Sequence, residues 1–244
     1  MRVAYSLAVN HERDLKRFST LKHTIPCEVC FMNKHILEDI NLLDIVDPII
    51  EHDVELVALK APKLSFPEDT WLLEKLLVIS DELNVHAILL PFRPDILEET
   101  RILEEYFNLF ASYKRFLVIE ADPQIVTSLR DRMLEYLGGV FKISIRYQKN
   151  VKTEDFVNIV ENCFGLLSFI KIVNCNEEGK LVKISEPGKL NFPLLVQKLV
   201  FRGYDGFIVL DYETRGLRLP LEDVIKEYEF MSEYIRSIRE KVER

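Results

Sequence analysis

Short apolar segments alternate with longer amphipathic segments from one end of the chain to the other. The short segments are rich in β-branched and aromatic residues, which favour the pleated and buried surface of a strand. They predict strands at residues 2–9, 27–32, 54–59, 85–91, 115–119, 140–147, 167–173 and 206–210.

The longer segments carry the apolar spacing that is typical of helices. Residues 34–50 contain apolar side chains at positions 36, 37, 40, 43 and 46, which form one helical stripe. Similar stripes predict helices at residues 70–83, 95–110 and 123–137, and further helices that begin near Thr153 and Pro220. Trp71 falls in the stripe of its helix, so we expect it in the core.

Strands that alternate with helices indicate parallel βαβ units, and eight such units close into a barrel. The length of 244 residues agrees with the roughly 250 residues of a (β/α)8 barrel. The rival fold, a doubly wound open sheet, usually has a glycine-rich loop after its first strand, and residues 8–12 contain no glycine. Without a linker or a shift in composition, the sequence predicts an α/β protein with a single (β/α)8 TIM barrel domain over residues 1–244.

Composition narrows the classes of partner. The formal net charge is −8, whereas nucleic-acid binders usually show a basic balance, so we expect no nucleic-acid partner. The chain starts directly with a strand-like segment and has no long apolar run, so we expect neither a signal peptide nor a membrane partner. These features favour a cytoplasmic location, and the share of charged residues, 30% and rich in Glu and Lys, is compatible with a thermophilic source.

Four cysteines are present, and two of them, Cys27 and Cys30, have the spacing of half a zinc site or of a redox pair. Residues three apart in a strand point to opposite faces, so the two thiols would not share a ligand. We therefore interpret this pair as structural.

The most specific motifs lie in the C-terminal third, at Glu186-Pro-Gly-Lys-Leu-Asn-Phe-Pro193 and at Arg202-Gly-Tyr-Asp-Gly-Phe-Ile-Val-Leu-Asp211. Two weaker motifs are Lys60-Ala-Pro62 and Ile119-Glu-Ala-Asp122. Together they resemble the xylose-isomerase-like barrel family, in which GEGxIDFP-like and GYDGxIVLE-like stretches flank the seventh helix and lead into the eighth strand. That family includes sugar isomerases and epimerases, dehydratases that act on sugar-like acids, and endonuclease IV.

The resemblance places the site at the C-terminal ends of the strands, where a (β/α)8 barrel carries its chemistry. It also implies that this chain has lost most of the family's metal ligands. Glu120 matches the glutamate of strand five, and Asp211 stands for the glutamate of strand eight, but cations replace the other ligands. Lys60 stands for the histidine of the HAP motif, Arg146 and Lys149 stand at the DxxH positions, and Lys171 replaces the histidine of the HLKD-like stretch.

Lysine and arginine do not coordinate a divalent metal, so we expect no metal cofactor. The five histidines agree with this expectation, because none follows His86, which begins the fourth predicted strand at the opposite end of the barrel. Lys183 falls near a further family histidine, the one that precedes the GEG loop.

A ring of fixed cations suits a small anionic polyol, such as a sugar phosphate or a sugar acid. We predict four basic residues as contacts for this ligand: Lys60, Arg93, Arg146 and Lys149. In an isomerase-like enzyme, Glu120 would act as the base and Asp211 or Glu213 as the second acid. Lys171 would polarise the carbonyl group of the substrate or form a Schiff base with it.

Two alternatives stay open. The same charges can form ion pairs that hold a degenerate barrel together, in a non-catalytic binding or scaffold protein. A repair nuclease like endonuclease IV is a third and less supported hypothesis, because the metal ligands are missing. A deep pocket at Glu120, Arg146 and Lys171 would favour an enzyme, and a mouth closed by direct ion pairs would oppose it. Barrels of this size often pair, so a homodimer is a further expectation, and Glu28 could face either the barrel axis or a helix.

Overall fold

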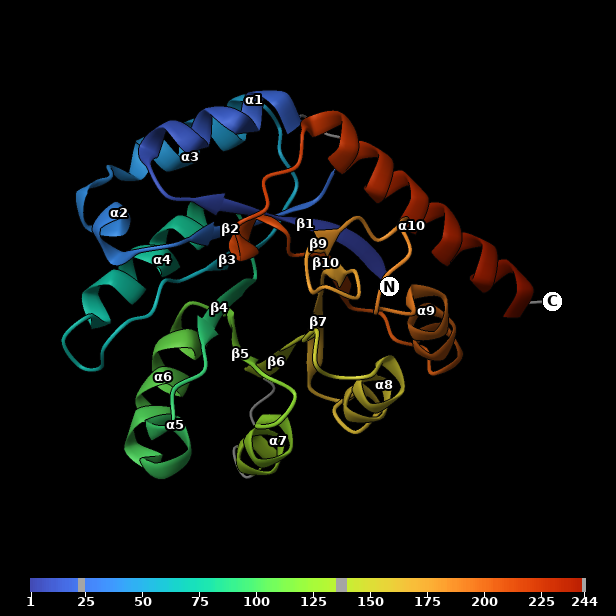
Figure 1. Ribbon diagram of the computed structural model, residues 1–244. Helices are drawn as coiled ribbons and strands as arrows, with labels where there is room; N and C mark the ends of the chain where they lie inside the picture. Colours follow the sequence, from blue (N-terminus) through green and yellow to red (C-terminus); the bar gives the residue numbers. More distant parts are fainter. Residues whose placement is uncertain (22–24, 135–139, 243–244) are drawn as a thin grey trace.

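The computed structural model describes residues 1–21, 25–134 and 140–242. Within these residues, eight parallel strands close into a barrel in the order β1-β10-β7-β6-β5-β4-β3-β2 (Figure 1). The strands are β1 Arg2–Val9, β2 Cys27–Phe31, β3 Leu56–Lys60, β4 Ala87–Pro91, β5 Phe116–Ala121, β6 Phe141–Arg146, β7 Leu167–Ile172 and β10 Phe207–Leu210. The predicted (β/α)8 barrel is therefore confirmed.

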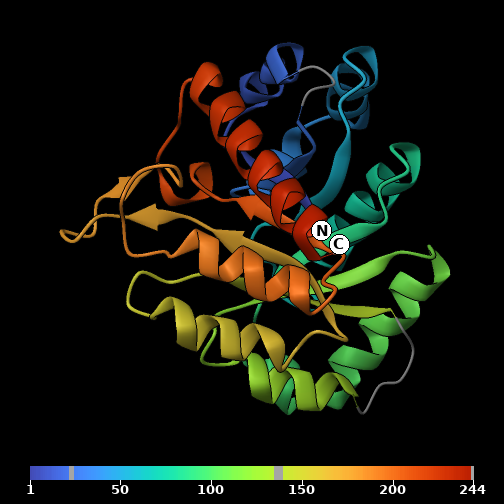
Figure 2. The same ribbon diagram turned by 90° about the vertical axis from the view of Figure 1, so that its right-hand side faces the viewer.

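Helices follow the strands and cover the outside of the barrel. After β1 to β4 come η1 Glu12–Arg17, α1 Phe18–Leu21, α2 Lys34–Asp39, α3 Leu42–Glu51, α4 Thr70–Glu82, α5 Asp95–Glu98 and α6 Thr100–Ser112. After β5 to β10 come α7 Val126–Leu134, α8 Thr153–Glu161, α9 Phe192–Phe201, η3 Glu213–Arg215 and α10 Leu221–Val242. Figure 2 shows α8, α9 and the long α10 packed beside one another, and no helix in the described part of the chain is long and apolar enough to cross a membrane.

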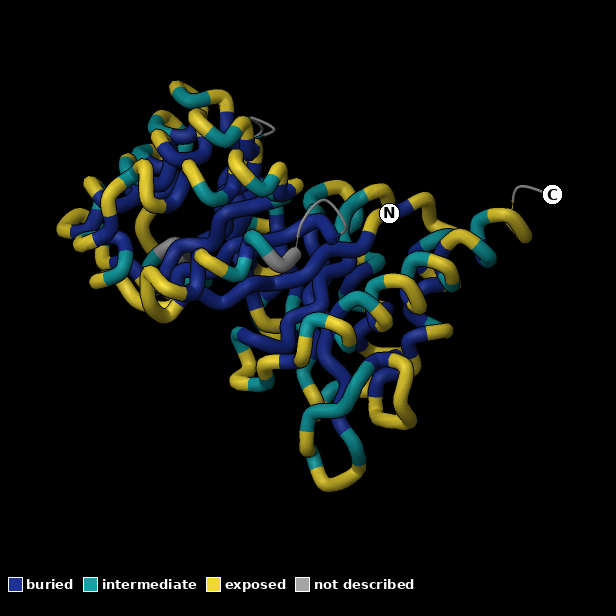
Figure 3. The backbone as a smooth tube through the Cα atoms, turned by 90° about the horizontal axis from the view of Figure 1, so that it is seen from above, coloured by how far each residue is buried: buried dark blue, intermediate teal, exposed yellow. Residues whose placement is uncertain are grey.

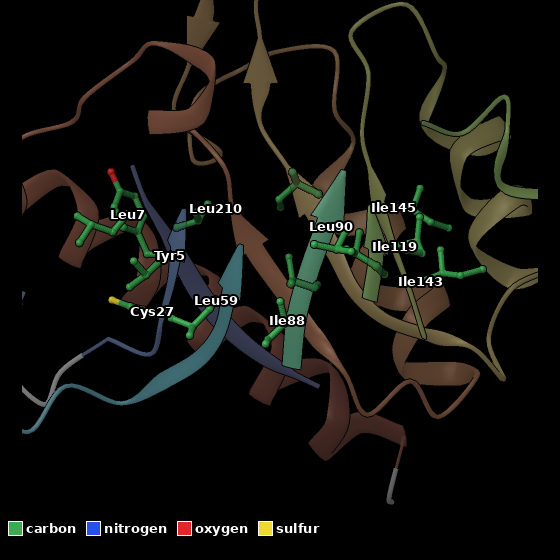
Figure 4. Close-up of a cluster of buried hydrophobic side chains, with 14 of the residues drawn as sticks. Tyr5, Leu7, Cys27, Leu59, Ile88, Leu90, Ile119, Ile143, Ile145 and Leu210 are labelled. Carbon is green, nitrogen blue, oxygen red and sulfur yellow. The ribbon is translucent and has the colours of Figure 1, made fainter. Parts of the chain in front are cut away.

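Two separate apolar clusters follow from the alternation of side chains along the strands. The larger one fills the space between the strands and the helices, and it includes Leu59, Ile119 and Ile143 (Figure 4). The smaller one lies inside the barrel and is built from Ala4, Ala58, Ala87, Leu89, Val118, Phe169 and Val209. The strands are buried on both faces, as the tube in Figure 3 shows in dark blue. Lys60 and Glu120 directly follow Leu59 and Ile119 of the larger cluster. Because side chains alternate along a strand, Lys60 and Glu120 face the barrel axis.

Several predicted elements differ from the structure. The helix predicted at 34–50 is two helices, because Ile40 has extended backbone angles (φ −75°, ψ 137°) and the Asn41 side chain accepts a hydrogen bond from the Leu43 N–H to begin α3. The helix predicted at 95–110 is also divided, at Glu99, whose backbone is extended. Of the helix predicted at 123–137, residues 126–134 are helical, and 135–137 lie outside the described residues.

Two further differences concern a missed hairpin and a misplaced side chain. Strands β8 Asn174–Cys175 and β9 Leu181–Val182 form an antiparallel hairpin that the sequence pattern did not predict, and it projects from the C-terminal end of the barrel (Figure 2). The placement of Trp71 in the core was wrong, since 49% of this residue is exposed. The apolar stripe of α4 is formed by its leucines and Ile79 instead.

Candidate functional site

The C-terminal half of the barrel interior holds a set of charged side chains that we call the charge network: Glu28 (β2), Lys60 (β3), Glu120 (β5), Arg146 (β6), Lys171 (β7) and Asp211, which follows β10. Lys171 pairs with Arg146 across β7 and β6, whereas Glu28 pairs with Ala58 across β2 and β3, two residues before Lys60. Glu28 faces the barrel axis, which decides the question that the sequence left open.

Glu120 is the centre of the network. Its Oε1 atom lies 2.6 Å from Lys60 Nζ and 2.6 Å from Arg146 Nη2, and its Oε2 atom lies 2.6 Å from Lys171 Nζ. Both oxygen atoms of this carboxylate are thus in contact with cations. Three positive groups around one buried carboxylate fix its position and its ionised state.

Lys171 joins Glu120 to Glu28, and it is completely buried. Its Nζ atom lies 2.5 Å from Glu28 Oε1, while Ser6 Oγ donates a 2.6 Å hydrogen bond to Glu28 Oε2. Each of these groups has a charged or polar partner, as a charge inside a protein requires.

Asp211 closes the other side of the network. Its Oδ2 atom lies 3.0 Å from Arg146 Nε, and its Oδ1 atom accepts a hydrogen bond from Thr214 Oγ1. Arg146 Nε and Asp211 Oδ2 are close but not aligned for a hydrogen bond. Arg215 Nε lies 4.0 Å from the same Oδ2 atom, so a second guanidinium reaches the network from its outer side.

The pKa shifts follow from these contacts. Burial would raise the pKa of Glu120, but Lys171, Lys60 and Arg146 together hold it below the ordinary value of a glutamate. Burial would likewise lower the pKa of Lys171, but Glu120 and Glu28 raise it well above the ordinary value of a lysine. A strong acid beside a strongly protonated amine is suited to electrostatics rather than to proton transfer near neutral pH.

Lys149 lies outside the charge network, in a neighbouring cavity of about 390 Å³ that we call the mouth pocket. Arg215 also lines this pocket, together with Gln148, Asn150 and the hairpin residue Gly179. Burial and the nearby Arg146 lower the pKa of Arg215, while Asp211, Asp122 and Glu120 act in the opposite direction. The pocket therefore offers cations and amides to a polar ligand.

Other candidates from the sequence lie elsewhere. Arg93 binds Asp95 and donates a 2.7 Å hydrogen bond to the Leu64 carbonyl oxygen, so it holds the loop after β4 instead of joining the network. Lys183 pairs with Asp223 at 2.8 Å, at the start of α10.

Glu213 is buried, but its carboxylate is already occupied by several donors. It binds Arg17 with both oxygen atoms, and it accepts hydrogen bonds from Tyr5 Oη at 2.9 Å and from the Ala8 N–H at 3.0 Å. These contacts tie the loop after β10 to strand β1 and to η1, which follows β1. The carboxylate thus fixes two loops of the mouth and is poorly placed to act as a second acid.

Three residues that contact the network were missed in the sequence: Ser6, Thr214 and Arg215. Ser6 lacked a signal, because a serine in a strand is common and only the register of β1 and β2 places it opposite Glu28. Arg215 did carry a signal, since it follows Asp211 by four residues in the loop that ends the last strand. Cys27 and Cys30 face opposite sides of β2, and burial raises the pKa of the Cys27 thiol to about 12.

The network also tests whether a divalent metal fits at the family's usual position. Both oxygen atoms of Glu120 already contact ammonium or guanidinium groups at 2.6 Å, and a metal ion there would meet three positive charges. In the described part of the chain, no group of three or more His, Cys, Asp or Glu side chains is arranged to hold a metal ion. The residues present do not fit such an ion.

No family model and no curated protein sequence matches this chain. Solved structures do resemble it over nearly its full length. A D-tagatose 3-epimerase-like protein is 19% identical with a TM-score of 0.73, covering 99% of this chain and 100% of its own. A xylose isomerase domain protein from Planctomyces limnophilus is 11% identical with a TM-score of 0.68, covering 97% of each chain.

A family 2 AP endonuclease from Brucella melitensis is 16% identical with a TM-score of 0.63, covering 88% of this chain and 94% of its own. At such low identity these similarities establish the fold and leave the activity open. The chain has the fold of the xylose-isomerase-like TIM barrels, as its sequence motifs predict.

Proposed function

We propose that this protein binds a small anionic polyol, a sugar phosphate or a sugar acid, at the C-terminal mouth of the barrel and without a divalent metal. One observation carries the proposal: fixed cations contact both oxygen atoms of Glu120, where related barrels are expected to hold a metal. Lysine and arginine can orient an anionic sugar directly, through a point charge and a planar fork of donors respectively.

The distribution of charge indicates where the anion binds. The buried charge network is balanced, with three carboxylates and three cations. The mouth pocket adds Lys149 and Arg215, and among the described residues that line it there is no Asp or Glu. This corner is therefore positive in a protein whose net charge is −8, and we place the phosphate or carboxylate of the ligand there.

The rest of the mouth pocket suits the sugar hydroxyls. Gln148 and Asn150 provide amide groups that both donate and accept hydrogen bonds, which is what a hydroxyl group needs from its partner. A volume of about 390 Å³ lies within the range of roughly 300–1,000 Å³ that is usual for small-molecule sites.

The geometry favours binding over isomerisation. Glu120 could act as a base only after the ligand had displaced Lys60 or Arg146, because both groups lie 2.6 Å from the same oxygen atom. Its low pKa, which the cations enforce despite burial, makes it a weak base near neutral pH. A lysine that forms a Schiff base needs a lowered pKa, and the pKa of Lys171 is raised.

The test is a thermal-shift screen of the purified protein, prepared without chelators, together with measurement of bound Mn, Mg and Zn. We expect no stoichiometric metal, and stabilisation by sugar phosphates or sugar acids but not by the neutral sugars. Lys149→Gln and Arg215→Gln should remove this stabilisation, while Lys226→Gln, an exposed lysine on α10, should preserve it.

Stoichiometric metal, or stabilisation that survives both pocket substitutions, would contradict the proposal. If none of the anionic sugars stabilises the protein, the ion pairs only hold the barrel together, as the non-catalytic alternative states. Turnover of a bound sugar that is abolished by Glu120→Gln would restore the isomerase hypothesis.

A further inference from the structure

The barrel has a second hollow at the N-terminal ends of its strands, opposite the charge network. A cavity of about 530 Å³ lies there, which exceeds the 390 Å³ of the mouth pocket. Its walls come from the first residues of β3, β4, β5, β6, β7 and β10, so we call it the basal pocket. Its volume also lies within the range of roughly 300–1,000 Å³ of small-molecule sites.

Several inward positions of the barrel carry small side chains, and one of them, Ala87, lines the basal pocket. Barrels of this type usually fill their interior with Val, Ile and Leu. Here the inward residues on β1, β3 and β4 include Ala4, Ala58 and Ala87, and they face larger residues such as Phe169 on the other side of the inner cluster. The short side chain of Ala87 leaves space at the lower end of the barrel that a larger residue would occupy.

Aromatic rings form much of the pocket wall. Phe169 and Phe207 stack with their ring centroids 5.6 Å apart and their planes within 13°. Phe116 is 42% exposed, and Phe164 is half-buried at the rim. Exposed aromatic surface gathered around a concavity favours an apolar, and above all an aromatic, ligand body.

A cation completes the pocket. Lys142 lies on the same side of β6 as Ser144 and Arg146, so its side chain enters the barrel from below. It is half-buried, and within the described residues no hydrogen bond or ion pair engages its amine. The neighbouring Arg2 is already engaged, by Glu55 and by the Phe207 ring 5.2 Å away. Lys142 is thus the cation at this end that can receive an anionic group.

We propose that the basal pocket is a second ligand site, independent of the mouth, that takes a small aromatic carboxylate. The ring of the ligand packs against the phenylalanines, and its carboxylate pairs with Lys142. The exposed His86 and Asp205 also line the pocket, so its rim carries an acidic side chain as well as Lys142. The phenylalanines form its apolar wall. A neutral aromatic compound would gain the apolar contacts but not the ion pair.

The experiment is titration calorimetry with naphthoate and with naphthalenemethanol, its neutral counterpart. We expect naphthoate to bind more tightly than the alcohol. Lys142→Met should lower the naphthoate affinity about tenfold, as for the loss of a charge-assisted hydrogen bond, and leave the alcohol unaffected. Ala87→Leu should weaken both probes, because its larger side chain occupies the cavity.

Lys226→Gln is the matched control, since this exposed lysine on α10 lines neither pocket, and it should leave naphthoate binding unchanged. Circular dichroism verifies that each variant is folded, and Lys142→Met serves alone if Ala87→Leu does not fold. The proposal is overturned if naphthoate fails to bind at about millimolar concentration, a weak-binding limit. It is equally overturned if the naphthoate affinity is the same in Lys142→Met as in the native protein.

Discussion

Replacing Lys171 by methionine is the sharpest perturbation of the charge network. Methionine has a similar length but no charge, and the site is fully buried. Glu120 would keep Lys60 and Arg146, whereas Glu28 would keep only the hydrogen bond from Ser6 among its contacts in the described residues. The cost of the change therefore arises mainly from Glu28.

Removing one partner of a buried ion pair costs about 3–5 kcal/mol, because the remaining charge stays buried without compensation. For a chain of this size, that loss corresponds to a decrease in Tm of roughly 6–20 °C. Urea unfolding at neutral pH, followed by circular dichroism, measures the change through the midpoint and the m-value.

The double variant Lys171→Met/Glu28→Gln is the decisive comparison. A neutral amide in place of Glu28 removes the uncompensated charge, so the double variant should be more stable than Lys171→Met alone. Glu28→Gln alone should cost less than Lys171→Met, since Lys171 would still contact Glu120 at 2.6 Å. If Lys171→Met costs less than about 1 kcal/mol, in the range of an exposed pair, Lys171 is not buried between two carboxylates and the network is wrong.

Three further predictions concern pH, a motif glycine and metals. The cations lower the pKa of Glu120 despite burial, so the stability that this carboxylate contributes is complete above its unfolded pKa of about 4.3 and decreases as the pH falls below that value. Urea midpoints measured toward about pH 3 should therefore fall more steeply for the native protein than for Glu120→Gln. Equal slopes would contradict the assignment. Gly188→Ala should destabilise the protein by about 1–3 kcal/mol in urea unfolding, because its Cβ would lie 2.2 Å from Asn174 Oδ1; a neutral effect would contradict the close packing of this loop. Added Mn, Mg, Zn or a chelator should change the Tm by less than about 1 °C. A ligand present at a hundred times its Kd would instead add about 2.7 kcal/mol to the free energy of unfolding. A clear metal-dependent increase in Tm would therefore refute the metal-free site.

The strands were predictable because a buried strand needs a run of apolar, β-branched residues, and each predicted run overlaps a strand of the barrel. The boundaries shifted by one or two residues, as for β4 and β6. The β8–β9 hairpin escaped prediction because strands of two residues show no periodicity. The break in the helix at 34–50 was readable at Asn41, a residue type that commonly caps helices.

The motifs predicted which residues would gather at the mouth but not how they would pair. Lys60, Glu120, Arg146, Lys171 and Asp211 do meet, as the positions at strand ends imply. Their pairing depends on side-chain directions and on the radius of the closed barrel, and a linear sequence shows neither. The same reason explains Arg93, which looked equivalent to Arg146 in sequence but turns to Asp95 on its own loop.

The ion pairs of the charge network make the cations at the strand ends dependent on one another. Glu120 touches three of them, and Lys171 in turn compensates Glu28, so each charge depends on the others. Restoring one histidine at position 60 would still leave Arg146 and Lys171 against Glu120, and a divalent ion would still be repelled. The network is internally neutral, so its charge is satisfied within the barrel, and the unbalanced cations lie at the mouth pocket. On the function proposed above, the charges on the barrel axis provide stability, and we expect recognition of an anion to fall to Lys149 and Arg215, which line the mouth pocket.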